Sequence, residues 1–365
     1  MTSRRRVLVL NCGSSSVKYR LFDDGETLAK GITERVTDHE AALRDILAQL
    51  DLSGLVAVGH RVVHGGTRFS APSLVDDDLI SVVRELIPLA PLHNPANLTG
   101  IEVARRLLPE VPQVAVFDTA FHRTMPPEAA TYALDAEVAE HFGIHRYGFH
   151  GTSHAYVSRR TGELLGKPEA NVITLHLGNG ASACAVRAGR SVATSMGFTP
   201  LPGLVMGTRS GDIDPAIVFY LVRVGGMSLD EVDELLNQRS GLKGLSGVND
   251  MRDVLSRAEG GDERAQLAFD LYCARIKSYV GAYYAQLGTV DAVTFTAGVG
   301  ENASLVRAAC LTGLHRLGIE IDPVRNAAGE TFISPDGAEV AVLVVPTEEE
   351  LEIATQTLAA VAESH

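Results

Sequence analysis

The sequence lacks paired cysteines and long apolar runs. Its four cysteines lie far apart and form no CxxC pair; they are Cys12, Cys184, Cys273 and Cys310. This spacing fits neither a zinc site nor a disulfide framework and indicates a reducing compartment. No apolar stretch reaches the ~18 residues of a membrane helix, and the run after Arg6 breaks at Asn11, too short for an export signal. We therefore expect a cytoplasmic protein that has no membrane partner.

Positive charge is also scarce. The 365 residues include 32 Lys and Arg against 45 Asp and Glu, which gives a formal net charge of −13. A surface of this sign repels the phosphates of nucleic acids. We expect no nucleic-acid partner, and any anionic substrate must be bound by a local basic site.

Two standard catalytic signatures are missing. No GxxxxGK[ST] occurs, which excludes a P-loop, and no HExxH occurs. The stretch "HFGIHRYGFHGTSH" holds four histidines, but its glycines interrupt any single helical face, which disfavours a four-histidine metal site. A single functional histidine, His150, is the better interpretation.

The chain instead alternates strand-like and helical segments. Apolar runs at residues 57–66, 113–122, 171–182, 291–302 and 339–351 each end in small or polar residues. Helical patterns lie between them, for example at 98–108 and 262–287. This order predicts an α/β protein, and the length predicts two domains with a first junction near residues 119–125.

The opening stretch "VLVLNCGSSSVK" suggests an anion site. Val7 to Leu10 read as a buried strand, and the glycine and three serines that follow can present several hydrogen-bond donors to a phosphate. A serine-rich β-hairpin turn explains the same residues equally well. The pattern is echoed by "TLHLGNGAS" at residues 174–182, which suggests one such turn in each domain.

Single residues elsewhere are ambiguous when taken alone. Arg61 and Arg209 stand beside small residues where an anion could approach, although packing or surface arginines look the same. Asp118 ends an apolar strand and suits either a turn cap or a metal-facing carboxylate. Thr347 and Glu350 predict a capping box for an amphipathic last helix, with Glu349 in its first turn. Gly298-x-Gly300-x-x-Ala303 imitates a dinucleotide fingerprint, but it stands late in the chain.

Taken together, several stretches resemble the acetate kinase family nearly end to end. They are "NCGSSSVK", "GHRVVHGG", "APLHNPAN", "VFDTAFH", "YGFHGTSH", "HLGNGAS", "TSMGFTPLPGLVMGTRSGDIDP", "FTAGVGEN" and "PTEEEL". The resemblance implies two duplicated ribonuclease H-like, actin-like ATPase domains around a nucleotide cleft, each a mixed sheet covered by helices. We expect residues 1–121 with 350–365 to form one domain and residues 122–349 the other.

The resemblance also implies the reaction ATP + acetate ⇌ ADP + acetyl phosphate, with Mg²⁺ (Mn²⁺ as a substitute), in a cytoplasmic homodimer. It assigns catalysis to Arg61, Asp118, His150 and Arg209, with His150 and Arg209 stabilising the transition state. It assigns the metal to Asn11 and Glu349 and the acyl pocket to Arg61, Val63, Leu92, Phe149 and Pro200. The ATP-binding residues it implies are Ser14, Ser16, Lys18, His176, Leu177, Gly178, Asn179, Gly180, Asp250, Met251, Arg252, Gly298, Val299, Gly300, Glu301 and Asn302.

Two features depart from the family pattern. The family usually has Asn where Glu348 stands, which places an extra carboxylate beside Glu349. The segment between Phe22 and Gly59 is shorter than in most relatives, which we expect to affect the surface of the first domain.

The chemistry agrees with the resemblance. Acetate is ionised at neutral pH, so it needs no general base, and the task is to bring a carboxylate against a triphosphate. Arginine binds both groups bidentately, and Mg²⁺ needs only one or two protein oxygens. We therefore expect direct in-line transfer. A propionate or butyrate kinase is the main alternative; an NAD-dependent oxidoreductase and an actin-like ATPase without a small-acid substrate are weaker ones.

Overall fold

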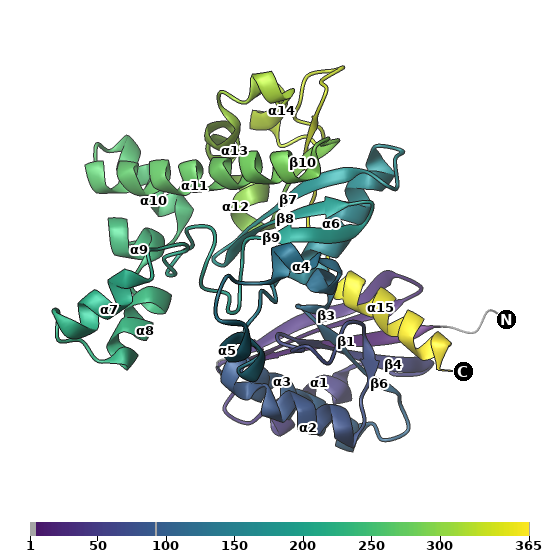
Figure 1. The fold of residues 1–365 in the computed structure, drawn as a ribbon. Helices are drawn as coiled ribbons and strands as arrows, with labels where there is room; N and C mark the ends of the chain where they lie inside the picture. The colour runs from purple at the N-terminus through teal and green to yellow at the C-terminus, as the bar shows by residue number, and fades with distance from the viewer. Residues whose placement is uncertain (1–4, 92, 365) are drawn as a thin grey trace. The chain divides into compact units, whose positions relative to one another are not determined.

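The computed structural model describes residues 5–91 and 93–364, and the chain divides into two compact units. Unit 1 contains the chain up to Arg123, the short segment Phe149–Ser153 and the chain from Glu348 onward; unit 2 contains Thr124–Gly148 and His154–Thr347. Each unit is built on its own mixed β-sheet covered by helices (Figure 1). This is the α/β class that the alternation of segments predicts.

The unit 1 sheet has six strands in the order β3-β2-β1-β4-β6-β5. Its strands are β1 (Arg6–Gly13), β2 (Ser16–Asp23), β3 (Glu26–Glu34), β4 (Leu55–Val62), β5 (Ser73–Leu74) and β6 (Gln113–Phe117). β1 and β2 form an antiparallel hairpin, whereas β1, β4 and β6 run parallel. The carboxyl ends of β1, β4 and β6 therefore meet at one edge of the sheet.

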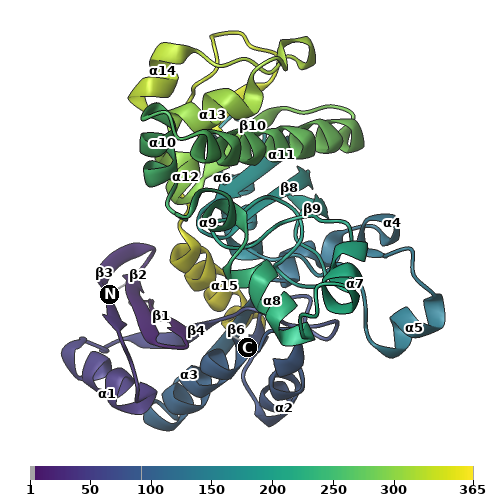
Figure 2. The same cartoon turned by 90° about the vertical axis from the view of Figure 1, so that its left-hand side faces the viewer.

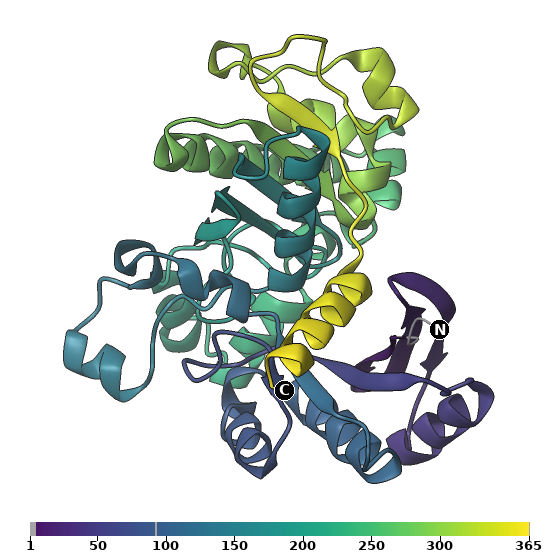
Figure 3. The ribbon, with the colours of Figure 1, turned by 90° about the vertical axis from the view of Figure 1, so that its right-hand side faces the viewer.

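Helices cover both faces of this sheet, which explains the uninterrupted apolar run of β1. Leu8 and Leu10 pack on one face with α1 (His39–Gln49) and α3 (Asn94–Leu107). Val7 and Val9 pack on the other with α15 (Glu349–Glu363), drawn in yellow in Figure 3. Since successive strand residues point to opposite faces, a strand covered on both sides has to be apolar throughout. The remaining helices of the unit are α2 (Asp77–Glu85), η1 (Ile87–Leu89) and η2 (Ala120–Thr124).

The unit 2 sheet has five strands in the order β11-β10-β7-β8-β9. They are β7 (Asn171–Leu177), β8 (Ala181–Arg187), β9 (Arg190–Thr194), β10 (Ala292–Thr296) and β11 (Ala341–Val344). β7 and β8 form an antiparallel hairpin, like β1 and β2 in unit 1, and β10 lies parallel to β7 and β11. The sequence echo therefore corresponds to one strand-turn-strand hairpin in each unit.

The helices of unit 2 lie on both faces of its sheet and in an extension beyond it. α6 (Gly151–Leu164) packs its Val157 against Val172 and Leu343, and α11 (Glu263–Leu287) lies on the opposite face (Figure 1). The others are α4 (Pro127–Ala130), α5 (Ala136–His141), α7 (Ala216–Arg223), α8 (Leu229–Gln238), α9 (Gly241–Ser246), α10 (Met251–Glu259), α12 (Ala297–Asn302), α13 (Ser304–Leu311), η3 (His315–Leu317) and α14 (Pro323–Ala328).

The start of the last helix differs from the sequence prediction. The expected capping box of Thr347 and Glu350 is wrong, because α15 begins at Glu349 and its N-cap, Glu348, makes no side-chain capping bond. The Thr347 amide donates instead to the Glu301 carboxylate, and Glu350 is held by Lys18. A carboxylate paired with a lysine on a neighbouring strand does not turn back to cap its own helix. Within residues 5–91 and 93–364, no helix combines the length and apolarity needed to cross a bilayer.

Candidate active site

An ion pair joins the ends of two neighbouring parallel strands in unit 1. Arg61 lies near the end of β4, and Asp118 directly follows β6. The Arg61 Nε lies 3.0 and 3.2 Å from the two Asp118 oxygens, and Nη2 lies 2.7 Å from Oδ2. The Asp118 side chain is 2% exposed and that of Arg61 is 22% exposed. The pair is therefore bidentate and almost buried, while part of the guanidinium still reaches solvent.

The charges around Arg61 keep it protonated. Burial lowers the pKa of Arg61, but the Asp118 carboxylate, with Glu349 and Glu350, outweighs burial and holds that pKa above its ordinary value. The Glu349 and Glu350 carboxylates therefore act on the same guanidinium as Asp118. These residues come from β4, from the end of β6 and from the first turn of α15, and together they form a charged cluster.

Phe149 and His150 are fixed to this cluster through the backbone. The Gly151 amide donates to the Asp118 carbonyl over 2.9 Å, and a Cβ on Gly151 would collide with that carbonyl. His122 donates from Nε2 to the Phe149 carbonyl over 2.9 Å. His150 itself has a φ of 57°, a left-handed conformation that is uncommon for residues other than glycine. Backbone held in this region is typical of functional sites, which supports His150 as the functional histidine.

Two ion pairs connect β2 to the first turn of α15. Lys18 pairs with Glu350, and Arg20 pairs with Glu348. Burial raises the pKa of Glu350, but its hydrogen bond with Lys18 outweighs burial and lowers that pKa overall. Glu349 lies between the two paired glutamates in the sequence, and in the described part of the chain it forms no ion pair of its own. The predicted phosphate ligand Lys18 is thus occupied by a carboxylate, and Arg20 neutralises the extra carboxylate Glu348.

The backbone just before the serine-rich turn between β1 and β2 is fixed by side-chain hydrogen bonds. His39 Nε2 lies 2.8 Å from the Gly13 carbonyl, and Asn97 donates to the Cys12 carbonyl over 2.8 Å. Ser14 is exposed, whereas Ser16 and Asn11 are half-buried. The turn is therefore a hairpin with accessible hydroxyls, so both sequence interpretations of it remain compatible with the fold.

Two predicted acyl-pocket residues of unit 1 are buried. Val63 is 8% exposed and Phe149 is 2% exposed. The Val63 amide donates to the Asn97 side chain over 3.1 Å, so its backbone position is fixed. Leu92, another residue predicted for this pocket, lies outside the described residues.

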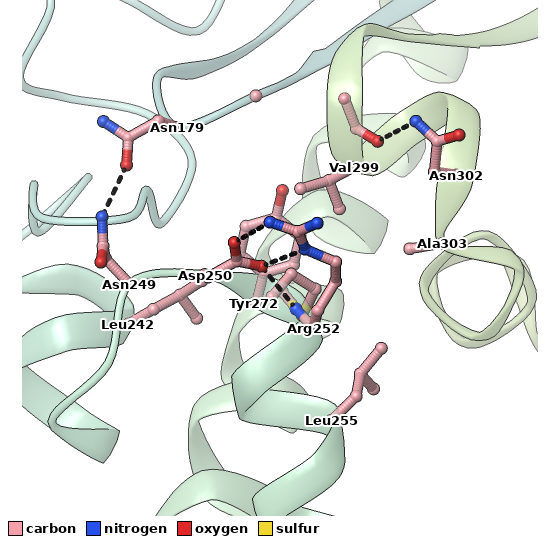
Figure 4. Close-up of a pocket in the computed structure, with 13 residues that line it drawn as sticks. Asn179, Leu242, Asn249, Asp250, Arg252, Leu255, Tyr272, Val299, Asn302 and Ala303 are labelled. Atoms are coloured by element: carbon pink, nitrogen blue, oxygen red, sulfur yellow. Dashed lines mark hydrogen bonds and ion pairs between the residues drawn. The ribbon is translucent and has the colours of Figure 1, made fainter.

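Unit 2 contains the second glycine turn, next to a cavity of about 590 Å³. Gly178 donates to the Gly180 carbonyl over 3.0 Å, and the Asn179 carbonyl accepts from Gly207 over 3.0 Å. The Asn249 side chain donates to Asn179 over 3.3 Å (Figure 4). The cavity is lined by Gly178, Asn179, Leu242, Asn249, Asp250, Met251, Arg252, Leu255, Tyr272, Gly298, Val299, Asn302 and Ala303.

The structure thus gathers half of the residues predicted to bind ATP, eight of sixteen, around one cavity. They come from the β7–β8 turn, from the start of α10 and from α12. Asp250 caps α10 and accepts from the Arg252 amide and from its Nε, at 2.9 and 3.0 Å, and the side-chain hydrogen bond from Arg252 lowers the pKa of Asp250 to about 2. His176, Leu177, Gly180, Gly300 and Glu301 belong to the same elements but do not line the cavity.

The α12 helix, which forms one wall of the cavity, is fixed by hydrogen bonds at both of its ends. Ala297 has a φ of 65°, and its amide donates to the Glu301 carboxylate over 2.8 Å. Arg307 is 1% exposed and donates to the carbonyls of Gly300 and Glu301 over 3.0 and 2.8 Å. A guanidinium at the carbonyl end of a helix satisfies orphan acceptors and suits the negative end of the helix dipole. No sequence pattern predicts a role for Arg307 or for the cavity residue Tyr272.

Arg209 and Pro200 lie together in unit 2. Arg209 donates from Nη1 to the Pro200 carbonyl over 2.7 Å, and burial lowers the pKa of Arg209. This is a half-buried guanidinium held by a carbonyl, with no carboxylate paired to it in the described residues. It therefore retains its positive charge for an anion.

The oxygen donors of unit 1 suit magnesium. In the part of the chain that the structure describes, no three His, Cys, Asp or Glu side chains are grouped as a ready-made metal site. Mg²⁺ does not require such a cage, because it keeps several waters and binds through one or two carboxylates together with substrate phosphates. The hard oxygen donors Asn11, Asp118 and Glu349 fit that requirement.

Comparisons with known proteins identify the family of this chain. The model of the Acetokinase family matches residues 36–355. The chain is 58% identical to the acetate kinase of Streptomyces coelicolor, with 99% of this chain and 98% of that protein covered. It is 59% identical to the acetate kinase of Streptomyces griseus, with 98% and 96% covered.

Solved structures give the same result. The acetate kinase of Porphyromonas gingivalis superposes with a TM-score of 0.93 at 42% identity, covering 98% of this chain and all of that one. A propionate kinase from Francisella tularensis reaches 0.92 at 42% identity, with 97% and 99% covered. The hexokinase of Thermus thermophilus, at 13% identity and 0.52 over 98% of this chain and 99% of that one, shares the fold alone. The predicted family and fold class are confirmed: the chain belongs to the acetate kinase family of phosphotransferases.

Proposed function

We propose that this protein transfers the γ-phosphoryl group of ATP reversibly to acetate, giving ADP and acetyl phosphate. The observation that carries the proposal is the Arg61–Asp118 pair, a nearly buried guanidinium fixed by a bidentate carboxylate with one edge still accessible. A planar, fixed guanidinium is the group that binds a carboxylate bidentately. The cavity lined by Asn179, Asp250 and Val299 is assigned to the adenosine.

Each assigned residue then has a distinct role. Arg61 binds and orients the acetate, whose carboxylate is already ionised and attacks the γ-phosphorus directly while the bond to the ADP oxygen breaks. Arg209 and His150 neutralise charge on the transferring phosphoryl group. No proton has to be moved and no side chain is phosphorylated, so trapping a phosphorylated residue on the path of transfer would contradict the proposal.

Asn11, Asp118 and Glu349 are the residues that would hold Mg²⁺, directly or through water. When bound, the ion neutralises the β- and γ-phosphates of the nucleotide. Glu348 and Glu350 are each ion-paired, whereas Glu349 forms no ion pair within the described residues. Mn²⁺ has similar ligand preferences and can substitute.

Propionate is the main alternative acceptor. The similarity to a propionate kinase is nearly as high as that to the acetate kinase of known structure. The acyl pocket that we assign to Val63, Leu92, Phe149 and Pro200 differs between the two functions only in volume, and one methylene in an apolar pocket changes the rate about 10- to 200-fold.

The deciding experiment measures ADP formation from Mg-ATP with acetate, propionate and butyrate at matched concentrations, with hydroxylamine trapping the acyl phosphate. We expect the highest kcat/KM with acetate. A preference for a longer acid would keep the mechanism and change the substrate, whereas ATP hydrolysis independent of any acid would contradict the proposal.

We also propose a homodimer formed through α7. All eight residues of α7 are at least partly exposed, although the helix reads "AIVFYLVR" and is almost entirely apolar. Phe219 is 57% exposed, Tyr220 64% and the following Val224 66%; α7 and α8 are labelled in Figure 2. An exposed apolar surface of this kind is typical of protein interfaces. Sedimentation should show a dimer that Phe219→Glu converts to a monomer, whereas Leu305→Glu, at a 62% exposed apolar residue of α13, should leave the dimer intact.

We place the reaction in the cytoplasm. All four cysteines are buried and none of them forms a disulfide, which is typical of proteins in a reducing compartment. Fractionation of cells that express the tagged chain should recover it with cytoplasmic markers.

A further inference from the structure

The nucleotide cavity contains a buried hydroxyl that the fold does not use. Tyr272, on α11, is 1% exposed and lines the cavity, and within the described residues its phenolic oxygen has no hydrogen-bond partner. Figure 4 shows its ring among the other lining side chains. An unsatisfied buried hydroxyl destabilises the folded protein, whereas a phenylalanine would fill the same space without that penalty.

Another tyrosine of α11 has a hydrogen-bond partner for its hydroxyl, as tyrosines in proteins usually do. The Tyr279 hydroxyl donates to Asp212 Oδ2 over 2.6 Å. The surroundings of Tyr272 instead include the thiols of Cys273 and Cys310, and burial raises the pKa of Tyr272 well above its ordinary value. The hydroxyl therefore stays protonated and can both donate and accept a hydrogen bond.

The rest of the cavity suits a flat heteroaromatic ring. Leu242, Met251 and Leu255 supply apolar surface from α9 and α10, and Val299 and Ala303 supply it from the α12 region. Side chains of this kind cover the faces of a ring, whereas the polar atoms on the edge of the ring need hydrogen-bonding partners. The Tyr272 hydroxyl, which has no hydrogen-bond partner within the described residues, can supply one such hydrogen bond.

We propose that the Tyr272 hydroxyl hydrogen-bonds to the edge of the nucleotide base and so contributes to the affinity for ATP and ADP. This inference rests on the proposed function, because it takes the cavity to be the nucleotide site. Tyr272 is a binding residue in this proposal and takes no part in the transfer of the phosphoryl group. We expect it to affect nucleotide binding and not acetate binding, because Arg61, the residue assigned to the acetate, does not line this cavity.

The test is Tyr272→Phe, which removes only the oxygen. We expect KM for ATP and Kd for ADP to rise about five- to tenfold, with kcat within about twofold and KM for acetate unchanged. Inorganic tripolyphosphate, which has no base, should inhibit the variant and the parent protein equally. The melting temperature without nucleotide should stay the same or rise, because an unsatisfied hydroxyl is removed, while the shift produced by ADP becomes smaller.

The matched control is Tyr283→Phe, since Tyr283 is buried on the same helix and does not line the cavity. It should leave the nucleotide constants unchanged. A purely structural role for Tyr272 predicts the opposite pattern, a lower melting temperature with unchanged nucleotide affinity, and that result would overturn the proposal. Equal weakening of ATP and tripolyphosphate would overturn contact with the base. Absence of acid-dependent turnover in the parent protein would instead contradict the proposed function.

Discussion

Arg61 and Asp118 form a bidentate ion pair across the ends of two neighbouring parallel strands, 57 residues apart in the chain. The pair depends on the register of β4 and β6, in which Arg61 lies beside Val116 and Val62 beside Phe117. Asp118 then follows the end of β6, and its amide donates to the Val62 carbonyl over 2.9 Å. One side of the guanidinium is thereby fixed while the other remains available to a substrate anion.

The first prediction concerns this pair. Asp118→Ala should lower the free energy of unfolding by about 3–5 kcal/mol, because it leaves a nearly buried guanidinium without its partner. Turnover should fall at the same time by two or more decades, since Arg61 loses its fixed orientation. Chemical denaturation and steady-state kinetics measure the two effects.

The exposed pair of Arg68 and Asp78 provides the control, because its side chains are 63% and 77% exposed at a separation of 3.5 Å. Asp78→Ala should change the free energy of unfolding by less than about 1 kcal/mol. Equal effects of the two substitutions would show that the Arg61–Asp118 pair stabilises the fold no more than an exposed ion pair does.

The second prediction tests Arg209. Arg209→Ala should lower kcat by about two or more decades and leave Kd for ATP nearly unchanged, because the guanidinium is assigned to charge that develops during transfer. Calorimetric titration of the nucleotide and initial rates provide the measurements. Arg209→Lys keeps the charge without the planar fork and should recover part of the loss. Near-normal turnover of the alanine variant would rule out the assigned role.

The third prediction separates two adjacent carboxylates at the start of α15. Glu349→Gln should lower kcat by about two or more decades and raise the Mg²⁺ concentration needed for half-maximal rate, because its charge is assigned to the metal. Glu348→Gln should change the rate less than about threefold, since that carboxylate is already paired with Arg20. Two measurements on both variants distinguish the two carboxylates. One is the dependence of the rate on Mg²⁺ concentration, and the other is Mn²⁺ binding followed by electron paramagnetic resonance. The reverse order of effects would assign the metal to Glu348.

The fourth prediction concerns stability at low pH. Burial lowers the pKa of His60 and of His122 to about 4, from an unfolded value of about 6.5. Between these values the unfolded chain binds protons that the folded chain does not, so stability is lost as the pH falls from about 6.5 to about 4. The loss approaches about 1.4 kcal/mol per pH unit for each histidine.

Denaturation at several pH values with His60→Gln measures this effect. The slope of the unfolding free energy against pH between pH 6.5 and 4 should decrease by the contribution of one histidine. His122→Gln provides a second test and should decrease the slope by the same amount. An unaltered slope in the His60 variant would mean that this histidine is protonated in the folded state.

The sequence alone determined the elements and the family. The apolar run Val7–Leu10 requires a strand covered on both faces. The glycine turns after β1 and β7 could be read locally, because each follows a strand and joins it to an antiparallel partner. The long stretches that resemble acetate kinases named Arg61, Asp118, Asp250 and Val299 as site residues. These assignments come from the resemblance, because each residue stands in a stretch that matches the family.

The tertiary structure decided which side chains meet. Arg20 and Glu348 are 328 residues apart, and the failed capping box at Thr347 follows from the same packing of α15 against β2. Arg307 and Tyr272 have no local pattern at all, since one is a buried arginine in a short helix and the other lies within a 25-residue helix. Ion pairs, buried donors and cavities depend on strand register and helix packing, and these bring together residues that are distant in the sequence.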